Sequence, residues 1–542
     1  MGSQVQKKLD VKEKEKASNQ PEKFQFKMEN EENIIKLIDR IRSDVAVGHD
    51  DIHAKLLKDS KDTIAKTLTQ LVNLAYKNST FPKCMKKAIV RAIHKKDSTE
   101  EASNYRPISI LSVLSKIFER SATDQLITYL EENNLLSETQ HAYRKGHSTH
   151  TCLSEIINYT YEENDKGNLV GIASLDLSKA FDSICHSHLI EKLRELGLGC
   201  SSLSWCESYL RGRKQKTKFK HYTSSEATVT AGVPQGSILG PILFICFTND
   251  LVKNLKNCKI VSYADDTQIL VSAKSVKQIK KLLENLISSA QTWYSANSLL
   301  NNASKTEIMV ISKRKQTEKL FINVTEEGKR KNLNAKKSIK VLGIYIDDEL
   351  NWNRQINEIN KKTNFAVRNL NRVNQLLTVK TGILLYNSLV ASHLNYADTV
   401  WSGCSKKNQG KLQRTQNKAV KSILGMKRSQ SSTEALKTAK LLPLDEKRKV
   451  HEGVYAYKAL NGKLPAAISR QYQNQQSHMN HRSTDRKILT IPRHNSEQYK
   501  NSPFYRTITT WNSIPHDIKE LETSASFKNQ YQKHLQEKFT DH

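Results

Sequence analysis

Three features are scarce in this sequence: paired cysteines, long apolar runs, and acidic residues relative to basic ones. The 8 cysteines are scattered over 542 residues, and none stands in a C-x-x-C pair or at a Cys/His spacing that suits zinc. No apolar run is long enough to span a membrane, and no signal peptide is recognisable. We therefore expect an intracellular protein, in the nucleus, the cytoplasm or both, with reduced thiols and no membrane contact.

The shortage of acidic residues indicates the class of partner. The chain has 86 Lys and Arg against 55 Asp and Glu, which gives a formal net charge of +31. Such an excess favours polyanions, because their binding releases counterions, so nucleic acid is the expected partner. Protein partners are not indicated by the composition.

Two adjacent aspartates lie between apolar segments. Residues 259–261 and 269–271 have the composition of β-strands, so the pattern predicts a hairpin with Asp265-Asp266 at its tip. A third carboxylate, Asp176, ends the apolar run 171–175. Neighbouring carboxylates repel one another and raise each other's pKa, whereas two hard divalent cations would compensate their charge. An isolated Asp-Asp pair would instead be read as a solvated hairpin tip.

Two motifs carry a resemblance to a known family. Tyr263-Ala264-Asp265-Asp266 resembles the Tyr/Phe-Ala-Asp-Asp signature of reverse transcriptases, and Asp176 followed by Ala180-Phe181 resembles their first carboxylate motif. The wider context, from about Asp44 to nearly the C-terminus, is similar to the polymerases of non-LTR (LINE-like) retrotransposons, especially the jockey and CR1-like groups.

The resemblance implies a fold, an activity and a set of partners. The fold is α+β, a right-hand polymerase with fingers, a palm carrying an antiparallel sheet, a helical thumb and a helical C-terminal region. The activity is that of an RNA-directed DNA polymerase, a nucleotidyltransferase that adds deoxynucleotides to a primer 3′-hydroxyl. The partners are an RNA template, a DNA primer or target DNA, and deoxynucleoside triphosphates.

The resemblance also assigns the catalytic residues, which are Asp176, Asp265 and Asp266. Together with Leu177 they form the expected metal-binding set for Mg²⁺, with Mn²⁺ as the alternative ion. Two such ions would activate the primer hydroxyl, bridge the phosphates and stabilise the leaving oxygen.

Two basic residues are expected to hold the triphosphate of the nucleotide. Residues 88–96 predict a strand that leads into a basic loop, and Arg106 follows in Asn104-Tyr105-Arg106-Pro107. By resemblance, Lys95 and Arg106 clamp the phosphates, since Arg can grip two oxygens and Lys acts as a point charge. Lys96 remains an alternative to Lys95.

Four further residues are expected to lie near the nucleotide. Phe181 is either the steric gate that excludes a ribose 2′-hydroxyl or a core aromatic, and the resemblance favours the gate. Gln235 and Gly236 lie in 232–241, where glycine allows close approach of the backbone before a helix. Lys305 is either the general acid that protonates pyrophosphate or an exposed lysine.

The sequence predicts five regions and no endonuclease domain before the palm. The palm and fingers together form a reverse transcriptase domain at about 78–350. The regions are a disordered charged N-terminus (1–29), an N-terminal extension with the fingers (30–150), the palm (151–350), a helical thumb (351–470) and a C-terminal region (471–542).

Three alternative functions remain at this point. A catalytically silent, element-derived protein would keep the charge and bind nucleic acid only. A viral RNA-dependent RNA polymerase would share the palm but typically carries Gly-Asp-Asp and a polar residue in place of Phe181. A group II intron maturase is the third, and the jockey-like C-terminal motif around Trp511 argues against it.

Overall fold

The computed structural model describes residues 23–95, 98–301, 305–313, 320–326, 329–475 and 488–541. The chain divides into two compact units, and each is described here by itself. Unit 1 contains residues 1–140, 177–254 and 290–301, and unit 2 contains residues 141–176, 255–289 and 302–542. The range predicted as palm, 151–350, therefore contributes to both units.

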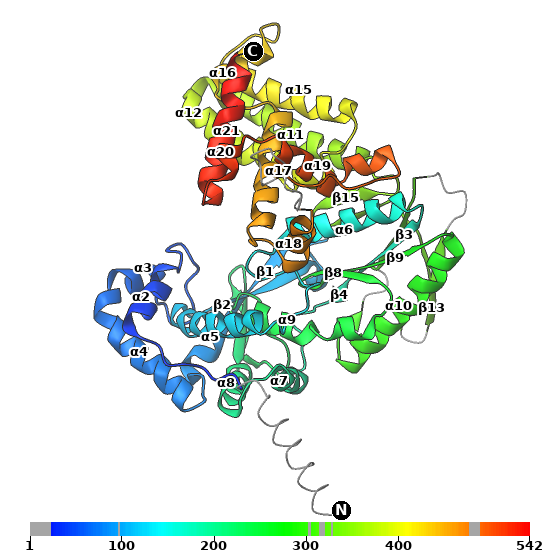
Figure 1. The fold of residues 1–542 in the computed structure, drawn as a ribbon. Helices are drawn as coiled ribbons and strands as arrows, with labels where there is room; N and C mark the ends of the chain where they lie inside the picture. Colours follow the sequence, from blue (N-terminus) through cyan, green and yellow to red (C-terminus); the bar gives the residue numbers. More distant parts are fainter. Residues whose placement is uncertain are drawn as a thin grey trace, which may run out of the picture. The chain divides into compact units, whose positions relative to one another are not determined.

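Unit 1 combines helices with a small, mostly antiparallel sheet (Figure 1). Its larger sheet has the order β2-β1-β5-β6, with β7 also paired to β5, and only the β1–β5 pair is parallel. The elements are α2 Glu31–Asp39, α3 Ala54–Asp59, α4 Lys61–Lys77, η1 Lys83–Lys86, β1 Lys87–His94, η2 Ala102–Asn104, β2 Tyr105–Leu111, α5 Val113–Glu132, β4 Leu177–Ser178, α7 His186–Glu195, α8 Cys200–Leu210, β5 Lys214–Phe219, β6 Tyr222–Thr223, β7 Ala227–Thr228, α9 Gly240–Thr248, η3 Leu251–Asn254 and β10 Leu300–Asn301.

The segment that precedes α2 is ordered, contrary to the prediction of disorder for residues 1–29. Phe24 is buried, and its backbone exchanges two hydrogen bonds of 2.9 Å with Gly197 and Gly199. Phe26 stacks on Tyr76 with a centroid separation of 4.9 Å. Two aromatic side chains among many charges are enough to hold the segment, because each buries a large apolar area. The prediction is thus wrong for 23–29, and residues 1–22 lie outside the described part of the chain.

Unit 2 is built around a four-stranded antiparallel sheet with the order β11-β3-β9-β8. Its strands are β3 Leu169–Leu175, β8 Lys259–Tyr263, β9 Asp266–Ala273 and β11 Glu307–Ile311. The central strands are apolar on both faces, which predicts cover on both sides.

Two helices provide that cover. Helix α6 (Thr149–Asp165) starts with a capping box, in which Ser148 and Thr151 exchange hydrogen bonds, and its apolar residues share a core with β3, β8 and β9 (Figure 1). On the other face, a Cβ at Gly171 of β3 would lie 2.4 Å from Ile279 of α10 (Val276–Ala296). Glycine therefore allows α10 to pack directly on the sheet. Residues 276–289 of α10 belong to unit 2, and the rest belong to unit 1.

The remainder of unit 2 is two hairpins followed by helices. A second core joins α17, α18, α19 and α21 through aromatic residues such as Tyr457, Trp511 and Phe527. The elements are β12 Phe321–Glu326, β13 Lys329–Asn334, β14 Ser338–Val341, β15 Ile344–Asp347, α11 Asn353–Val373, η4 Asn374–Leu376, α12 Val379–Tyr386, the π-helix η5 Asn387–Ala391, α13 Ser392–Asn395, α14 Asp398–Trp401, α15 Lys406–Ile423, α16 Ser432–Thr438, α17 Leu444–Leu460, α18 Ala466–Gln473, η6 Glu497–Asn501, α19 Pro503–Asn512, α20 His516–Lys519 and α21 Ser524–Asp541.

The α+β class predicted from the sequence is confirmed by this mixture of sheets and separate helices. Among the described residues, every helix is too short or too polar to cross a membrane.

The docked N-terminal segment gives a first test. Phe24→Ala removes a buried ring that contacts Phe26 and Tyr129, so we expect a local loss of about 3 kcal/mol and faster deuterium exchange at the amides of Phe24 and Gly199. Met28→Ala, at a side chain that is 57% exposed, is the matched control and should leave both amides unchanged. Equal exchange in the two variants would contradict docking by Phe24.

Candidate active site

The three predicted carboxylates lie at one end of the sheet in unit 2. Strand β3 ends at Leu175, which pairs with Thr267 of β9, so Asp176 is the next residue along and lies at the level of Asp266. Strands β8 and β9 form the expected hairpin, closed by the pair Tyr263 and Asp266. The sequence could predict each strand, and the register now shows that both strand ends meet.

The turn itself consists of two residues. Ala264 has a φ of +55°, a left-handed conformation that is costly for a residue with a Cβ, and Asp265 follows it. Adjacent hydrogen-bonded side chains stabilise the base of the hairpin, where the Ser262 and Thr267 hydroxyls lie 3.2 Å apart. Asp265 and Asp266 therefore lie at the tip of a hairpin whose turn has a strained backbone at Ala264, and the side-chain contact at its base supports that turn.

The carboxylates influence one another electrostatically. Asp266 as a whole residue is exposed, yet burial of its carboxyl group is the largest cause that raises its pKa to about 6. The negative charges of Asp265 and then Asp176 raise this pKa further. The coupling shows that the three groups share one electrostatic environment, since like charges at this range disfavour ionisation.

Lys305 provides one compensating charge. It precedes β11, and because Glu307 pairs with Ser174, the register brings residue 305 to the level of Asp176. Its Nζ lies 3.2 Å from Asp176 Oδ2, while the lysine side chain is 63% exposed. The structure thus places Lys305, a residue predicted near the nucleotide, beside one of the predicted catalytic carboxylates.

The donor chemistry fits a hard divalent cation. Carboxylate oxygens are the ligands that Mg²⁺ prefers, and the mutual repulsion at Asp266 is what a cation would relieve. The apolar side chain of Leu177 leaves its carbonyl oxygen as the group that could take part. Within the described ranges, no three His, Cys, Asp or Glu side chains lie close enough together to form a metal-binding cluster.

The residues predicted to bind the nucleotide lie mostly in unit 1. On the β1–β2 hairpin, Ile93 pairs with Arg106, which places Arg106 near Lys95 just beyond the end of β1. The Lys95 amide donates to the carbonyl of Asn104 at 2.9 Å, and the Lys95 side chain is exposed. Lys96, the alternative, lies outside the described residues.

Gln235 and Gly236 pack against the same strand pair. The amide of Ser109 in β2 donates to the Gln235 carbonyl at 2.6 Å, and Gln235 Nε2 donates to Asp182 Oδ2 at 2.8 Å. Gly236 has a φ of +126°, and a Cβ there would lie 2.5 Å from the Ser109 carbonyl oxygen. Only glycine allows the loop to lie this close to β2.

Phe181 lies in the loop after β4 and is half-buried. Its ring stacks on Phe244 of α9 at a centroid distance of 4.5 Å, and its carbonyl accepts a 2.8 Å hydrogen bond from the Val233 amide. The ring is thus supported from one side, which is compatible both with a gate and with a core aromatic.

Two residues near these sites were not predicted. Glu119 is fully buried in α5, and its carboxylate accepts a 2.7 Å hydrogen bond from the Ile238 amide, next to the Gln235-Gly236 turn. Burial raises the pKa of Glu119. Tyr143, in unit 2, has a left-handed φ of +59°, and its pKa is raised by burial and by Asp265. Glu119 is one of several charged residues in α5, so neither it nor Tyr143 carried a sequence signal that set it apart.

Comparison with known proteins gives the class. Residues 93–346 match the sequence profile of the family described as "Reverse transcriptase (RNA-dependent DNA polymerase)", inside the range 78–350 predicted for this domain. These residues form a reverse transcriptase domain, and the motif-based prediction of that class is confirmed.

Within this class, the chain is similar to the polymerases of jockey-like, non-LTR elements. It is 27% identical to the RNA-directed DNA polymerase from mobile element jockey of Drosophila melanogaster, over 73% of this chain and 44% of that protein. It is 27% identical to the probable RNA-directed DNA polymerase from transposon BS of the same species, over 72% of this chain and 44% of that protein. It is 25% identical to the probable RNA-directed DNA polymerase from transposon X-element of Drosophila melanogaster, over 78% of this chain and 47% of that protein. The chain thus spans a little under half of these relatives.

Among solved structures, an apo telomerase from Candida tropicalis, truncated from its C-terminal domain, aligns with a TM-score of 0.35 and 13% identity. The alignment covers 55% of this chain and 59% of that chain.

The Gly236 turn can be tested against a matched glycine. Gly236→Ala should break the contact with Ser109 and accelerate deuterium exchange at the Ser109 amide about 10-fold or more. Gly212→Ala is the control, because Gly212 also has a positive φ (+69°) but a Cβ there meets nothing within 4 Å. It should leave Ser109 unchanged, and equal exchange in both variants would refute the steric argument.

Proposed function

We propose that this chain is an RNA-directed DNA polymerase that adds deoxynucleotides to the 3′-hydroxyl of a primer. The observation that carries the proposal is the meeting of Asp176 with Asp265 and Asp266 at one sheet end. These aspartates belong to the segment that matches reverse transcriptases. A solvated hairpin tip would not require a third carboxylate on the neighbouring strand.

The chain's residues take the following roles in this proposal. Asp176, Asp265 and Asp266 hold Mg²⁺, or Mn²⁺, with the carbonyl oxygen of Leu177 completing the set. When bound, the two ions supply Lewis-acid stabilisation of the attacking and leaving oxygens. Lys305 lies beside Asp176 and donates a proton to the leaving pyrophosphate.

In unit 1, the proposed nucleotide-binding residues position the substrate. Lys95 and Arg106 bind the triphosphate, since both extend from the same hairpin. Gln235 and Gly236 form the wall beside the base, fixed on β2 by the Ser109 contact. Phe181 excludes the ribose 2′-hydroxyl, with Phe244 as its support.

The same proposal assigns the larger parts of the chain. The sheet of unit 2 with α6 and α10 is the palm, the β1–β2 region belongs to the fingers, and the helices that begin at α11 form the thumb and C-terminal region. The net charge of +31 supports binding of an RNA template and a DNA primer along this protein. The alternative is a catalytically silent protein that only binds nucleic acid. Activity measurements distinguish this alternative from a polymerase.

Catalysis is tested by dTTP incorporation on poly(rA)/oligo(dT) with Mg²⁺. Asp265→Ala should reduce the rate by about 10²–10³-fold or more, as expected when one preorganised electrostatic group is removed, while duplex binding persists. Asp348→Ala removes one acid of the second Asp-Asp pair, which follows β15, and should retain the wild-type rate. A silent wild-type protein that binds the duplex in a salt-sensitive way would refute the proposed activity.

The role of Phe181 is tested by sugar selectivity. Phe181→Val should increase ribonucleotide incorporation relative to deoxynucleotide incorporation by about 10-fold or more, because the clash with the 2′-hydroxyl is removed. Phe244→Leu changes the stacked partner and serves as the control for altered packing. If both variants melt earlier while selectivity stays at the wild-type value, Phe181 is a core aromatic and not a gate.

A further inference from the structure

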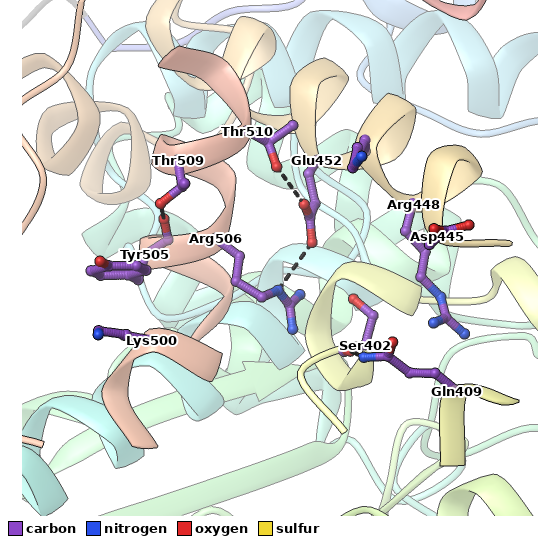
Figure 2. Close-up of a pocket in the computed structure, with 11 residues that line it drawn as sticks. Ser402, Gln409, Asp445, Arg448, Glu452, Lys500, Tyr505, Arg506, Thr509 and Thr510 are labelled. Atoms are coloured by element: carbon purple, nitrogen blue, oxygen red, sulfur yellow. Dashed lines mark hydrogen bonds and ion pairs between the residues drawn. The ribbon is translucent and has the colours of Figure 1, made fainter. Parts of the chain in front are cut away.

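A cavity of about 350 Å³ lies among the C-terminal helices of unit 2, and none of the residues assigned above lines it (Figure 2). Residues from α15, α17 and α19 and from the short segments before α15 and α19 line it. Its basic side chains are Arg448, Lys449, Lys500 and Arg506, and its acidic ones are Asp445 and Glu452. The lining therefore carries a positive excess.

One of the two arginines is engaged within the protein. Arg506 Nε donates to Glu452 Oε1 at 3.0 Å, and its Nη atoms donate to the carbonyls of Asn501 and Thr399. Glu452 Oε2 in turn accepts from the Thr510 hydroxyl at 2.7 Å. Glu452 is thus neutralised by Arg506, as the dashed contacts in Figure 2 show, and neither group is available to a ligand.

Arg448 differs from Arg506. Its side chain is buried, with 6% exposed, but within the described chain its Nε and Nη2 have no hydrogen-bond partner. The guanidinium lies 5.1 Å from the centre of the Trp401 ring, which supports it without satisfying its N–H groups. Burial lowers the pKa of Arg448. The carboxylates of Asp398 and Glu452 favour the charged form of Arg448, but they leave these two N–H groups without an acceptor. Buried donors without acceptors are costly, so an oxygen-rich anion would stabilise them.

The cavity has a second buried donor, the hydroxyl of Ser402. Ser402 is 6% exposed, and its hydroxyl also lacks a partner among the described residues. The two flanking lysines are themselves exposed and pair with residues of their own helices, Lys449 with Glu446 and Lys500 with Glu497, each at 2.7 Å. Such surface pairs contribute little, so both lysines can turn toward an anion.

We infer that this cavity binds one phosphate group of a nucleic-acid strand. Arg448 offers the planar fork that matches two phosphate oxygens, and the Ser402 hydroxyl offers a further donor. Tyr505 also lines the cavity and provides an aromatic face for the attached nucleotide. The volume, near the lower end of the range of about 300–1,000 Å³ for ligand pockets, accommodates one nucleotide unit.

The test measures binding of labelled single-stranded RNA and DNA to the full chain over a salt series, without nucleotide substrates. Arg448→Met should weaken strand binding about 10-fold or more and lower the salt slope by about 0.7, as expected for one lost phosphate contact. Lys533→Gln removes one charge from an exposed position on α21 and should keep the wild-type affinity. The RNA and DNA arms identify which strand supplies the phosphate.

Stability measurements separate a ligand site from a structural role. Because Met fills the space without a buried charge, Arg448→Met should melt at or above the wild-type temperature. If Arg448→Met melts several degrees lower than the wild type, Ser402→Ala becomes the test variant. We expect Ser402→Ala to lose strand affinity a few-fold while its melting temperature stays unchanged. The inference would be overturned if Arg448→Met folds stably and binds strands like the wild type. If Arg448→Met is destabilised, wild-type strand binding by Ser402→Ala would overturn it.

A further arm tests free phosphate as the ligand. Stabilisation of the wild type by inorganic phosphate at constant ionic strength, lost in Arg448→Met, would support the anion site. If that stabilisation occurs while strand affinity is unaffected by Arg448→Met, the site takes free phosphate and the nucleic-acid inference falls. Asp265→Ala should bind strands like the wild type, so a failure of the polymerase proposal is distinguishable from a failure here.

Discussion

The crowding of three carboxylates at one sheet end is the constraint on which the rest of this structure depends. Asp176, Asp265 and Asp266 oppose one another electrostatically, and after burial the charges of Asp265 and Asp176 are the causes that raise the pKa of Asp266. Flexible loops would let such groups move apart. Here they are carried by paired strands whose apolar residues are buried between α6 and α10, so the repulsion is opposed by the packing of the sheet.

In unit 1, the same principle holds the residues proposed to bind the nucleotide. The Gln235-Gly236 turn is fixed on β2 through Ser109, and the buried Glu119 accepts the Ile238 amide close by. Backbone hydrogen bonds therefore determine where these side chains lie. A buried carboxylate that receives backbone donors is a rigid support, because any movement would leave it unsatisfied.

Much of this arrangement could be predicted from local sequence. Short apolar runs predicted the β8–β9 hairpin and β3, and the Tyr-Ala-Asp-Asp motif predicted the class that comparison then confirmed. What could not be predicted depends on tertiary contacts. The docking of Phe24 relies on Tyr129, which is far away in the sequence, and the charge-rich composition around it suggested disorder. Arg448 looked like any basic residue until its burial was known.

The register of β3 has a consequence for insertions and deletions. Side chains alternate between the two faces of a strand, and Asp176 follows β3 directly, so its position is counted from the pairs that β3 makes with β9 and β11. Removing one residue from 170–174 would either displace Asp176 from the level of Asp266 and Lys305 or turn the covered faces of β3 over. The number of residues in β3 is therefore constrained as strictly as the presence of an aspartate at position 176.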